Sequence, residues 1–430
     1  MKILPAKKIR GEIKIPGDKS ISHRAIMLSS LGNTPVEISN FLLGADCIST
    51  INCMKKLGAK IEVSGEKIIV TGNGLYGLQE PAEILDAGNS GTTLRLLLGL
   101  ISPQNFFATF TGDESLRQRP MARVIKPLQE MGAKIFGHNE NKNLPISVLK
   151  SEKKLRGIKY KMPVASAQVK SAIILAGLFA DDCTEIIEPA PSRNHTEKML
   201  SAFGAKIEQN ANTIKIYPAK NLTAPEKINV PGDISSAAYW IVLATILPDS
   251  EIIIKNVGVN ETRTGIIDVL KKMGAKIEFL NKKISGGEIS ADLKINSAKL
   301  HGIEFGGEMI PRLIDEIPIL AVASAFAESE TIIHDVEELR VKETDRLAAI
   351  VQEFNKISAG SFKATENSLI ILGNREKNFA ECKTYADHRM AMSLSIFGTA
   401  AKGVELDNSD CVKISYPNFF ETLNFNNILS

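Results

Sequence analysis

The chain has 430 residues, of which 44% are apolar and 23% charged, and its formal net charge is +3. This composition is typical of a globular protein and excludes a disordered one, while the length predicts two domains rather than one core. A net charge so close to zero gives no indication of a protein that binds nucleic acids or membrane surfaces, so any cationic function must come from local clustering.

The chain begins Met-Lys-Ile-Leu-Pro and continues into a charged segment that has no apolar signal core. No stretch of about 18 apolar residues follows, so we expect no membrane-spanning helix. The five cysteines form no CxxC pair and their number is odd, which indicates reduced thiols. These features predict a cytoplasmic protein without a membrane partner.

A five-residue motif, apolar-Gly-Ala-Lys-Ile, occurs four times. Its copies are residues 57–61, 131–135, 203–207 and 273–277, and their glycines are 74, 72 and 70 residues apart. Each copy follows an apolar pattern with helical spacing, which predicts a helix capped by a left-handed Gly and followed directly by a strand. Weaker copies end at Asn355 and Asn426, so we expect six repeated units.

A second correspondence links the two halves of the chain. Residues 15–20, Ile-Pro-Gly-Asp-Lys-Ser, are echoed 215 residues later by Val-Pro-Gly-Asp-Ile-Ser at 230–235. Both copies leave a strand, turn and enter an apolar helix, as expected where the chain crosses between two similar lobes. We therefore predict an α/β fold of two lobes, residues 1–18 with 232–430 and residues 19–231, each with three units and separated by a cleft.

Polar motifs recur where loops enter apolar helices. In chain order they are residues 19–24, 88–95, 166–168, 340–346 and 387–389. Capping explains Ser, Asp and Asn at such places. It does not explain Lys19, Arg24, Lys342, Arg346 and Arg389, because a cation at a helix N-terminus opposes the helix dipole. The repeated conflict predicts that these helix starts bind an external anion.

Three further residues are candidates. Arg119, next to Pro120, is the best placed of three arginines in the loop 112–123; we expect the other two to be solvated. Asp315 lies in a nearly apolar run and is either a buried helix cap or a catalytic base. Glu343 is either functional or simply a surface partner of Arg346, three residues on.

Two phosphate-binding patterns and a metal site can be dismissed. Residues 72–77 fit GxGxxG, but Pro81 interrupts the next segment and no acidic residue follows at the ribose position, so a turn is favoured over a dinucleotide site. Residues 16–20 lack the upstream glycine of an ATP-binding loop. The six histidines form no HxxxH-type pair, so we expect no metal.

Taken together, the motifs resemble the enolpyruvyl transferases, and in particular the 5-enolpyruvylshikimate-3-phosphate synthases. The matching blocks run in order along the whole chain: residues 16–24, 88–95, 119–121, 166–172, 194–200, 315–318, 340–347 and 387–392. The resemblance implies two lobes of three βαβαββ units each, an inside-out α/β barrel. It also implies a monomeric transferase that moves the enolpyruvyl group of phosphoenolpyruvate to the 5-hydroxyl of shikimate 3-phosphate and needs no cofactor.

The resemblance also implies roles for individual residues. Phosphoenolpyruvate would be bound by Lys19, Gly91, Arg119, Gln168, Arg346 and Arg389. Shikimate 3-phosphate would be bound by Ser20, Arg24, Ser166, Ala167, Gln168, Arg193, Asp315 and Lys342. Asp315 would accept the hydroxyl proton, and Glu343, with Lys19 nearby, would protonate the methylene carbon. Surrounding cations would stabilise the anionic tetrahedral intermediate.

Some positions depart from one common family pattern. Ala167 stands in place of a serine, which removes a hydroxyl contact to the substrate phosphate, and Arg193 stands where serine is frequent and would restore it. Ile414 replaces a frequent lysine, so Lys413 is left out of the site. Gly91 is retained where glyphosate would pack, which predicts sensitivity to glyphosate.

Two rival functions remain. A sister enzyme that uses UDP-N-acetylglucosamine usually has a reactive Cys before its Arg-Pro, but residues 112–119 contain none. A non-catalytic repeat protein that binds phosphorylated ligands would need neither Asp315 nor Glu343.

Overall fold

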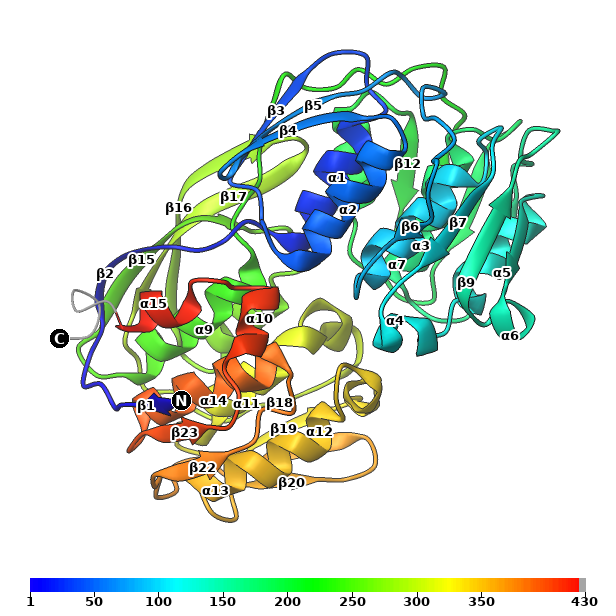
Figure 1. Cartoon of the computed structure of the whole chain (residues 1–430). Helices are drawn as coiled ribbons and strands as arrows, with labels where there is room; N and C mark the ends of the chain where they lie inside the picture. The colour runs from blue at the N-terminus through cyan, green and yellow to red at the C-terminus, as the bar shows by residue number, and fades with distance from the viewer. Residues whose placement is uncertain (425–430) are drawn as a thin grey trace. The chain divides into compact units, whose positions relative to one another are not determined.

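The structure is a computed structural model, and it describes residues 1–424 (Figure 1). The chain divides into two compact units. Unit 1 comprises Met1–Pro16, Gly232–Lys283 and Ile289–Ser430; unit 2 comprises Gly17–Pro231 and Ile284–Glu288. Asp18 lies in unit 2 because its N–H donates to the carbonyl of Pro231 and its carboxylate caps the first helix of that unit.

Unit 2 contains three four-stranded sheets with the orders β14-β3-β5-β4, β6-β7-β9-β8 and β10-β11-β13-β12. Its strands are β3 (Val36–Ser39), β4 (Lys60–Ser64), β5 (Lys67–Thr71), β6 (Leu85–Asp86), β7 (Ala108–Thr111), β8 (Lys134–Gly137), β9 (Asn143–Leu149), β10 (Lys159–Lys161), β11 (Thr184–Ile187), β12 (Ile207–Asn210), β13 (Thr213–Ile216) and β14 (Lys227–Asn229). In every sheet the first pair is parallel and the other two pairs are antiparallel. The identical pattern makes each sheet one repeat.

Each parallel pair of strands needs a crossover, and helices supply it. The helices of unit 2 are α1 (Lys19–Ser29), α2 (Ala45–Lys56), α3 (Gly91–Ile101), α4 (Glu114–Gln118), α5 (Ala122–Glu130), α6 (His138–Asn141), α7 (Ala167–Gly177) and α8 (His195–Ala202). The order strand, helix, strand, helix, strand, strand is the predicted βαβαββ unit.

Unit 1 also contains three sheets, with the orders β2-β15-β17-β16, β18-β19-β21-β20 and β1-β23-β22. Its strands are β1 (Lys2–Ile3), β2 (Arg10–Lys14), β15 (Glu251–Gly258), β16 (Lys276–Ser285), β17 (Glu288–Asn296), β18 (Glu304–Phe305), β19 (Thr331–His334), β20 (Phe362–Ala364), β21 (Ser368–Ile371), β22 (Ala380–Cys382) and β23 (Val404–Leu406). In the last sheet β1, from the start of the chain, lies antiparallel to β23 and takes the place of the repeat's own third strand.

The helices of unit 1 follow the same repeat. They are α9 (Ile234–Ile246), α10 (Gly265–Lys272), η1 (Gly307–Arg312), η2 (Ile314–Glu316), α11 (Ile317–Ala325), η3 (Glu337–Val341), α12 (Arg346–Ala349), the π-turn η4 (Ile350–Phe354), α13 (Asn355–Ile357), α14 (His388–Ala400), η5 (Asp410–Ile414) and α15 (Phe419–Asn424). The α/β class and the repeated units predicted from the sequence are therefore confirmed.

The strand before each of the two Pro-Gly-Asp segments pairs in one unit, while the helix after the segment belongs to the other unit. β2 precedes α1 in the chain but pairs with β15 of unit 1, and β14 precedes α9 but pairs with β3 of unit 2. Each segment thus leaves a strand of one unit and enters a helix of the other, which explains the sequence echo at residues 15–20 and 230–235.

The glycines of the repeated motif cap their helices as predicted. Gly58, Gly132, Gly204 and Gly274 have φ values of +92°, +102°, +81° and +106°, a region that side chains disfavour. The prediction for Asn355 is wrong, because its φ is −67° and the helix continues to Ile357. Asn355 instead bonds to both backbone groups of Phe362. Asn426 lies outside the described residues.

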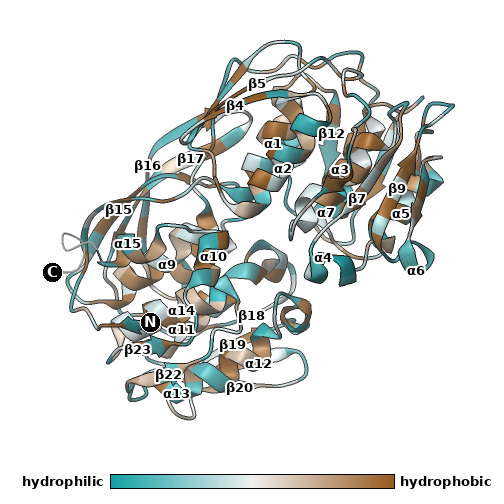
Figure 2. Ribbon diagram, in the orientation of Figure 1, coloured by the Kyte–Doolittle hydropathy of each residue, from teal (hydrophilic) through white to brown (hydrophobic). Residues whose placement is uncertain are grey.

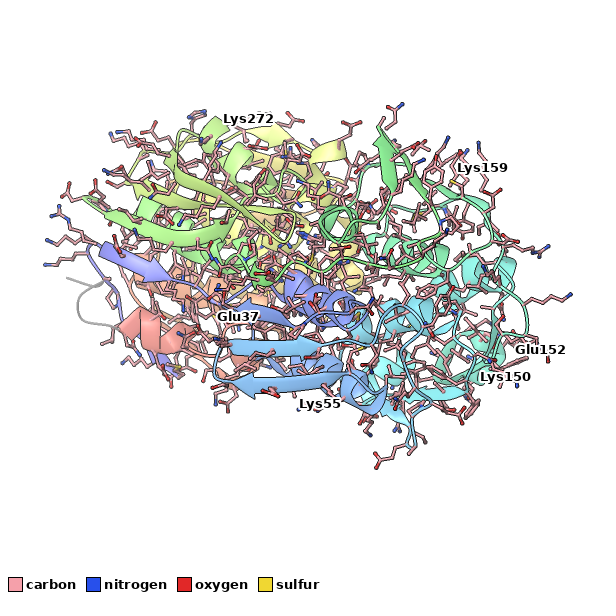
Figure 3. The ribbon with its side chains drawn as sticks, turned by 90° about the horizontal axis from the view of Figure 1, so that it is seen from above. Glu37, Lys55, Lys150, Glu152, Lys159 and Lys272 are labelled. Atoms are coloured by element: carbon pink, nitrogen blue, oxygen red, sulfur yellow. The ribbon has the colours of Figure 1, made fainter. Side chains whose placement is uncertain are left out.

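Each unit has its own core of buried apolar side chains, and α11 is buried along its whole length. Figure 2 shows hydrophobic residues along the helices and strands of both units. Charged side chains such as Lys55, Lys150 and Lys272 lie at the surface (Figure 3). Within the core of unit 2, α3 and α7 approach so closely that a Cβ on Gly99 would lie 2.2 Å from the carbonyl oxygen of Ala172. This contact brings the starts of the two helices together. Among the residues described, no helix is long and apolar enough to cross a bilayer.

Candidate active site

The predicted helix starts of unit 2 are capped by side chains. Asp18 accepts from the amide of Ile21, and Ser90 and Ser166 accept in the same way at the starts of α3 and α7. Capping therefore explains these three polar residues, while the cations beside them have other partners.

Arg24 is buried on α1, and neutral oxygen atoms hold its guanidinium group. Nε donates to Thr196 Oγ1 at 2.7 Å, Nη2 to Ser171 Oγ at 2.8 Å and Nη1 to the Ser20 carbonyl at 2.9 Å. Burial lowers the pKa of Arg24 to about 10, which still leaves the group charged at neutral pH. The three bonds fix the orientation of a guanidinium group that keeps its charge.

Lys19 begins α1 and forms an ion pair with Asp46, with its Nζ 3.2 Å from Asp46 Oδ2. Its side chain remains 28% exposed. A partly exposed ammonium group can exchange this partner for an anionic ligand.

Two arginines, Arg95 and Arg119, lie beside Gly91, the first residue of α3. A Cβ placed on Gly91 would lie 3.0 Å from Arg95 Nη1 and 3.6 Å from Arg119 Nη1. Arg119 donates to the carbonyl and side-chain oxygens of Asn89, at 3.2 and 2.6 Å. Burial, and then the charges of Arg119 and Arg123, lower the pKa of Arg95 to about 10. The helix start therefore carries concentrated positive charge.

Gln168 connects α7 to α3. Its Oε1 accepts a hydrogen bond from Arg95, and its Nε2 donates to Thr92 Oγ1 at 2.9 Å. The sequence predicted Gln168 but assigned no role to Arg95 or Thr92. Both residues lie in the polar motif 88–95, and this position could have identified them as site candidates.

Ser166 and Ala167 form the start of α7, and Arg193 lies in the segment that precedes α8. Ala167 is the first residue of the helix, and Arg193 is half-buried, with its charge close enough to contribute to lowering the pKa of Arg24. The segment before Arg193 is anchored by a lysine that the sequence analysis missed. Lys170 is fully buried and its Nζ lies 2.8 Å from Glu188, 2.8 Å from Glu197 and 3.2 Å from the Ser192 carbonyl.

In unit 1, Asp315 lies among three cations. Its carboxylate oxygens are 3.6 Å from Lys342 Nζ, 3.5 Å from Arg346 Nη1 and 3.9 Å from Arg389 Nη2. It does not cap α11, whose N-cap residue is Glu316. The helix-cap alternative thus fails, and Asp315 lies in a cluster where carboxylates and cations alternate, since Arg346 also pairs with Glu343 and Asp387.

Arg346 is buried and bonded to two carboxylates. Its Nε lies 2.8 Å from Asp387 Oδ2, and its Nη2 lies 2.6 Å from Glu343 Oε2. Burial would lower the pKa of Arg346, but these two carboxylates outweigh burial and raise it. Burial raises the pKa of Glu343, but Arg346 outweighs that effect and lowers it. Glu343 is therefore ionised at neutral pH in this state.

Arg389 sits at the start of α14, where Asp387 accepts from its backbone amide at 2.8 Å. Its guanidinium donates to the carbonyl of Asp315 at 3.1 Å and to Ser235 Oγ at 3.3 Å. Burial opposes its charge, but Asp315 and other neighbouring groups raise its pKa. Glu316, also buried, accepts from Ser235.

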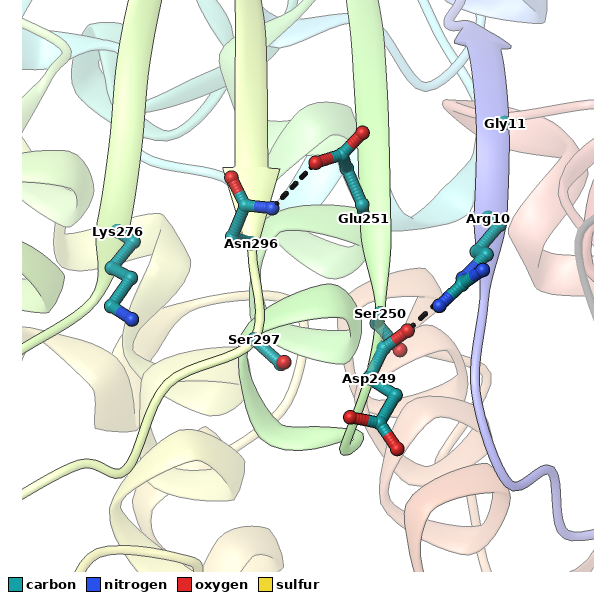
Figure 4. A pocket seen from close by; sticks show the side chains of 8 residues that line it. All are labelled: Arg10, Gly11, Asp249, Ser250, Glu251, Lys276, Asn296 and Ser297. Atoms are coloured by element: carbon teal, nitrogen blue, oxygen red, sulfur yellow. Dashed lines mark hydrogen bonds between the residues drawn. The ribbon is translucent and has the colours of Figure 1, made fainter.

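A hollow of about 620 Å³ lies elsewhere in unit 1, at one end of the sheet that contains β2 and β15 (Figure 4). Its lining residues are Arg10, Gly11, Asp249, Ser250, Glu251, Lys276, Asn296 and Ser297. None of the predicted site residues lies there. Within residues 1–424, no group of three or more His, Cys, Asp and Glu side chains is arranged to hold a metal ion.

Known proteins resemble this chain over nearly its whole length. The family model for EPSP synthase (3-phosphoshikimate 1-carboxyvinyltransferase) matches residues 3–423. A 3-phosphoshikimate 1-carboxyvinyltransferase of Thermoanaerobacter sp. (strain X514) is 54% identical over 415 residues, covering 96% of this chain and 97% of the relative. Another, of Desulforamulus reducens, is 50% identical and covers 98% of both chains.

Solved structures agree. An EPSP synthase from Acinetobacter baumannii superposes with a TM-score of 0.92 at 40% identity, covering 100% of this chain and 98% of the other. The enolpyruvyl transferase NikO from Streptomyces tendae shares the fold, with a TM-score of 0.79 at 18% identity over 98% of this chain and 96% of the other. The chain belongs to the EPSP synthase (3-phosphoshikimate 1-carboxyvinyltransferase) family.

Proposed function

We propose that this protein transfers the enolpyruvyl group of phosphoenolpyruvate to the 5-hydroxyl of shikimate 3-phosphate and releases phosphate. Family membership over the whole chain supports the activity. The observation that carries the chemistry is Asp315, a carboxylate held 3.5 to 3.9 Å from three cations. Such a cluster suits a reaction in which both substrates are anions and a hydroxyl must lose its proton.

The proposed reaction has two steps. The 5-hydroxyl oxygen adds to C2 of phosphoenolpyruvate, its proton goes to Asp315, and C3 receives a proton from Glu343, which gives a tetrahedral intermediate. The C2–O bond to phosphate then breaks, the Glu343 carboxylate takes a proton back from C3, and phosphate leaves with the proton that Asp315 had accepted. Lys19, Arg119, Arg346 and Arg389 are the proposed ligands of phosphoenolpyruvate, since arginine binds carboxylate and phosphate oxygens in a bidentate manner. Gly91 and Gln168 are proposed as further contacts of phosphoenolpyruvate.

Shikimate 3-phosphate is proposed to bind through Ser20, Arg24, Ser166, the backbone of Ala167, Gln168, Arg193, Asp315 and Lys342. The fixed guanidinium of Arg24 suits the carboxylate of this substrate, and the start of α7 with Arg193 suits its phosphate.

The ionised Glu343 needs to gain a proton before it can act as an acid. In this structure Arg346 holds its pKa down. An anionic substrate on Arg346 would compete for the guanidinium and add negative charge nearby, and both effects raise the pKa of Glu343. Substrate binding would thus convert Glu343 into a proton donor.

The deciding experiment measures phosphate release after the protein is mixed with phosphoenolpyruvate and either shikimate 3-phosphate or UDP-N-acetylglucosamine. We expect release only with shikimate 3-phosphate. Release only with the sugar nucleotide would reject the assignment, and release with neither would favour the non-catalytic alternative. We take units 1 and 2 as the two lobes of the family fold, and we propose a cytoplasmic monomer that binds no nucleic acid.

A further inference from the structure

The helix that begins with Arg346 contains a π-turn. The helix runs from α12 through the π-turn η4 into α13, and Glu353 lies within the π-turn. An inserted π-turn widens the helix locally and changes the direction in which its side chains point; such turns are frequent at functional sites. Here the side chain that it carries is a carboxylate with no exposed surface.

Donors surround the carboxylate of Glu353. Oε2 accepts from the backbone amide of Lys383 at 2.8 Å and from Lys356 Nζ at 2.6 Å, and Oε1 accepts from Tyr385 Oη at 2.9 Å. Burial, and then the bond to Glu353, raise the pKa of Tyr385 to about 12, so the phenol remains a donor at neutral pH. Two of these donors belong to one loop, residues 383–387.

That loop has an unfavourable backbone conformation. Tyr385 and Ala386 are consecutive residues with φ values of +55° and +53°, a region that side chains rarely adopt unless their surroundings hold them there. The next residue is Asp387, which is fully buried and bonds to Arg346. The same helix therefore holds the loop at two points, through Glu353 at one end and through Arg346 at the other.

We propose that Glu353 is a positioning residue for phosphoenolpyruvate binding. By holding residues 383–385 it keeps Asp387 in the orientation that directs Arg346 and caps α14 through the amide of Arg389. Without the Glu353 carboxylate the strained loop relaxes, and Arg346 and Arg389 lose the correctly placed Asp387 carboxylate to which both bond. This inference rests on the proposed function, which assigns Arg346 and Arg389 to phosphoenolpyruvate.

The test compares Glu353→Gln with Asn355→Ala. The first variant keeps the size of the side chain but puts an amide N–H₂ among donors. The second removes bonds of the same helix to Phe362 without touching the loop. We expect both variants to lower the melting temperature, but only E353Q to raise the KM for phosphoenolpyruvate, by about tenfold, which corresponds to about 1.4 kcal/mol. The KM for shikimate 3-phosphate should change less than about twofold.

An equal rise in both KM values for E353Q, or no rise in either, would overturn the proposal. If E353Q does not fold, Tyr385→Phe removes the hydroxyl that contacts both Glu353 Oε1 and Gln352 Oε1 at 2.9 Å, and it should shift the KM for phosphoenolpyruvate in the same direction by a smaller factor. Amide hydrogen exchange gives a readout that does not depend on activity. In E353Q, residues 383–390 should exchange faster than in the unmodified protein, while in N355A they should not.

The two hypotheses fail in distinguishable ways. If the unmodified protein releases no phosphate from the two substrates, the proposed function fails, but faster exchange in E353Q still supports the positioning of the loop. If the protein is active and exchange of residues 383–390 is the same in E353Q as in the unmodified protein, the inference about Glu353 is wrong.

Discussion

Arg346 and Asp387 form a buried two-point ion pair, in which Nε lies 2.8 Å from Oδ2 and Nη2 lies 3.4 Å from Oδ1. The Asp387 carboxylate also accepts from the amide of Arg389, so one side chain both orients a buried arginine and caps α14.

Replacing Asp387 by Asn should therefore destabilise the fold strongly. The substitution leaves the Arg346 guanidinium buried with much less compensation, which typically costs about 3 kcal/mol or more. Asp345→Asn is a matched control, because Asp345 caps the helix of Arg346 from a half-exposed position and its loss should cost about 1 kcal/mol or less. Urea unfolding measures both. Equal losses in the two variants would contradict a special role for the buried pair.

Replacing Asp315 by Asn should reduce kcat by about 10²- to 10⁴-fold, the usual contribution of a general base. Its effect on KM should be smaller, because an amide can still accept a hydrogen bond from the substrate hydroxyl. The control is Glu308→Gln, an exposed carboxylate on η1 of the same unit. A D315N protein with unchanged kcat would remove Asp315 from the mechanism and support a non-catalytic role for the chain.

The parts of the fold that were predictable are those with local signals. A left-handed Gly after an apolar helix is a local property, so four copies of Gly-Ala-Lys-Ile predicted four repeats. The pairing of β1 with β23 joins Lys2 to Glu405, and nothing in either segment indicates the other. Asn355 failed as a cap because its tertiary bonds to Phe362 stabilise a longer helix than its own preference for αL suggests.

The site shows the same division. Lys19, Arg346 and Arg389 stood out in the sequence because a cation at a helix start opposes the helix dipole. The same expectation is wrong for Arg24, the sixth residue of α1, and for Lys342, which follows η3.

The partners of the cations in the site did not stand out, since the bond between Arg95 and Gln168 depends on how closely α3 packs against α7. Lys170 resembled an ordinary helix residue, and only the fold shows that Glu188 and Glu197 surround it.

Stability at acid pH should depend on His23. This histidine is fully buried, and burial, opposed by Asp46 but aided by Lys19, lowers its pKa from 6.5 to about 3. The unfolded chain binds a proton below about pH 6.5 and the folded chain does not, so stability falls as the pH drops from 6.5 towards 3. Between pH 7.5 and 5.0 this single group should cost about 2 kcal/mol.

Asn in place of His23 does not titrate but can still bond to Thr50, the partner of Nδ1 at 2.6 Å. Urea unfolding at pH 7.5 and 5.0 gives the drop in unfolding free energy for each protein, and the drop should be smaller in H23N by about 2 kcal/mol. Identical drops in the two proteins would show that His23 does not remain neutral in the fold.

Lys170→Met should destabilise the protein by about 3 to 5 kcal/mol, because it leaves Glu188 and Glu197 buried without their cation. Adding Glu197→Gln to K170M should recover part of the loss, since one uncompensated charge is removed. Urea unfolding of the two single variants and the double variant tests this coupling. Strictly additive losses would mean that the Glu197 carboxylate does not depend on Lys170.

The departure from the family pattern at the start of α7 gives a test of substrate binding. We propose that Arg193 replaces the hydroxyl that Ala167 lacks, so Arg193→Ala should raise the KM for shikimate 3-phosphate. A charged contact to phosphate is typically worth about 1.5 to 3 kcal/mol, which predicts an increase of about 10- to 150-fold. The KM for phosphoenolpyruvate should change little, because Arg193 is not among its proposed ligands.

Adding Ala167→Ser to Arg193→Ala should restore part of the lost affinity, because it places a hydroxyl at the first residue of α7, next to the cap residue Ser166. Ala167→Ser alone should have a small effect, since Arg193 already makes the contact. The four proteins form a double-mutant cycle in the KM for shikimate 3-phosphate, and the expected coupling between the two positions is about 0.5 kcal/mol or more. If the A167S substitution changes KM by the same factor whether or not Arg193 is present, the two residues do not share the phosphate and the compensation is wrong.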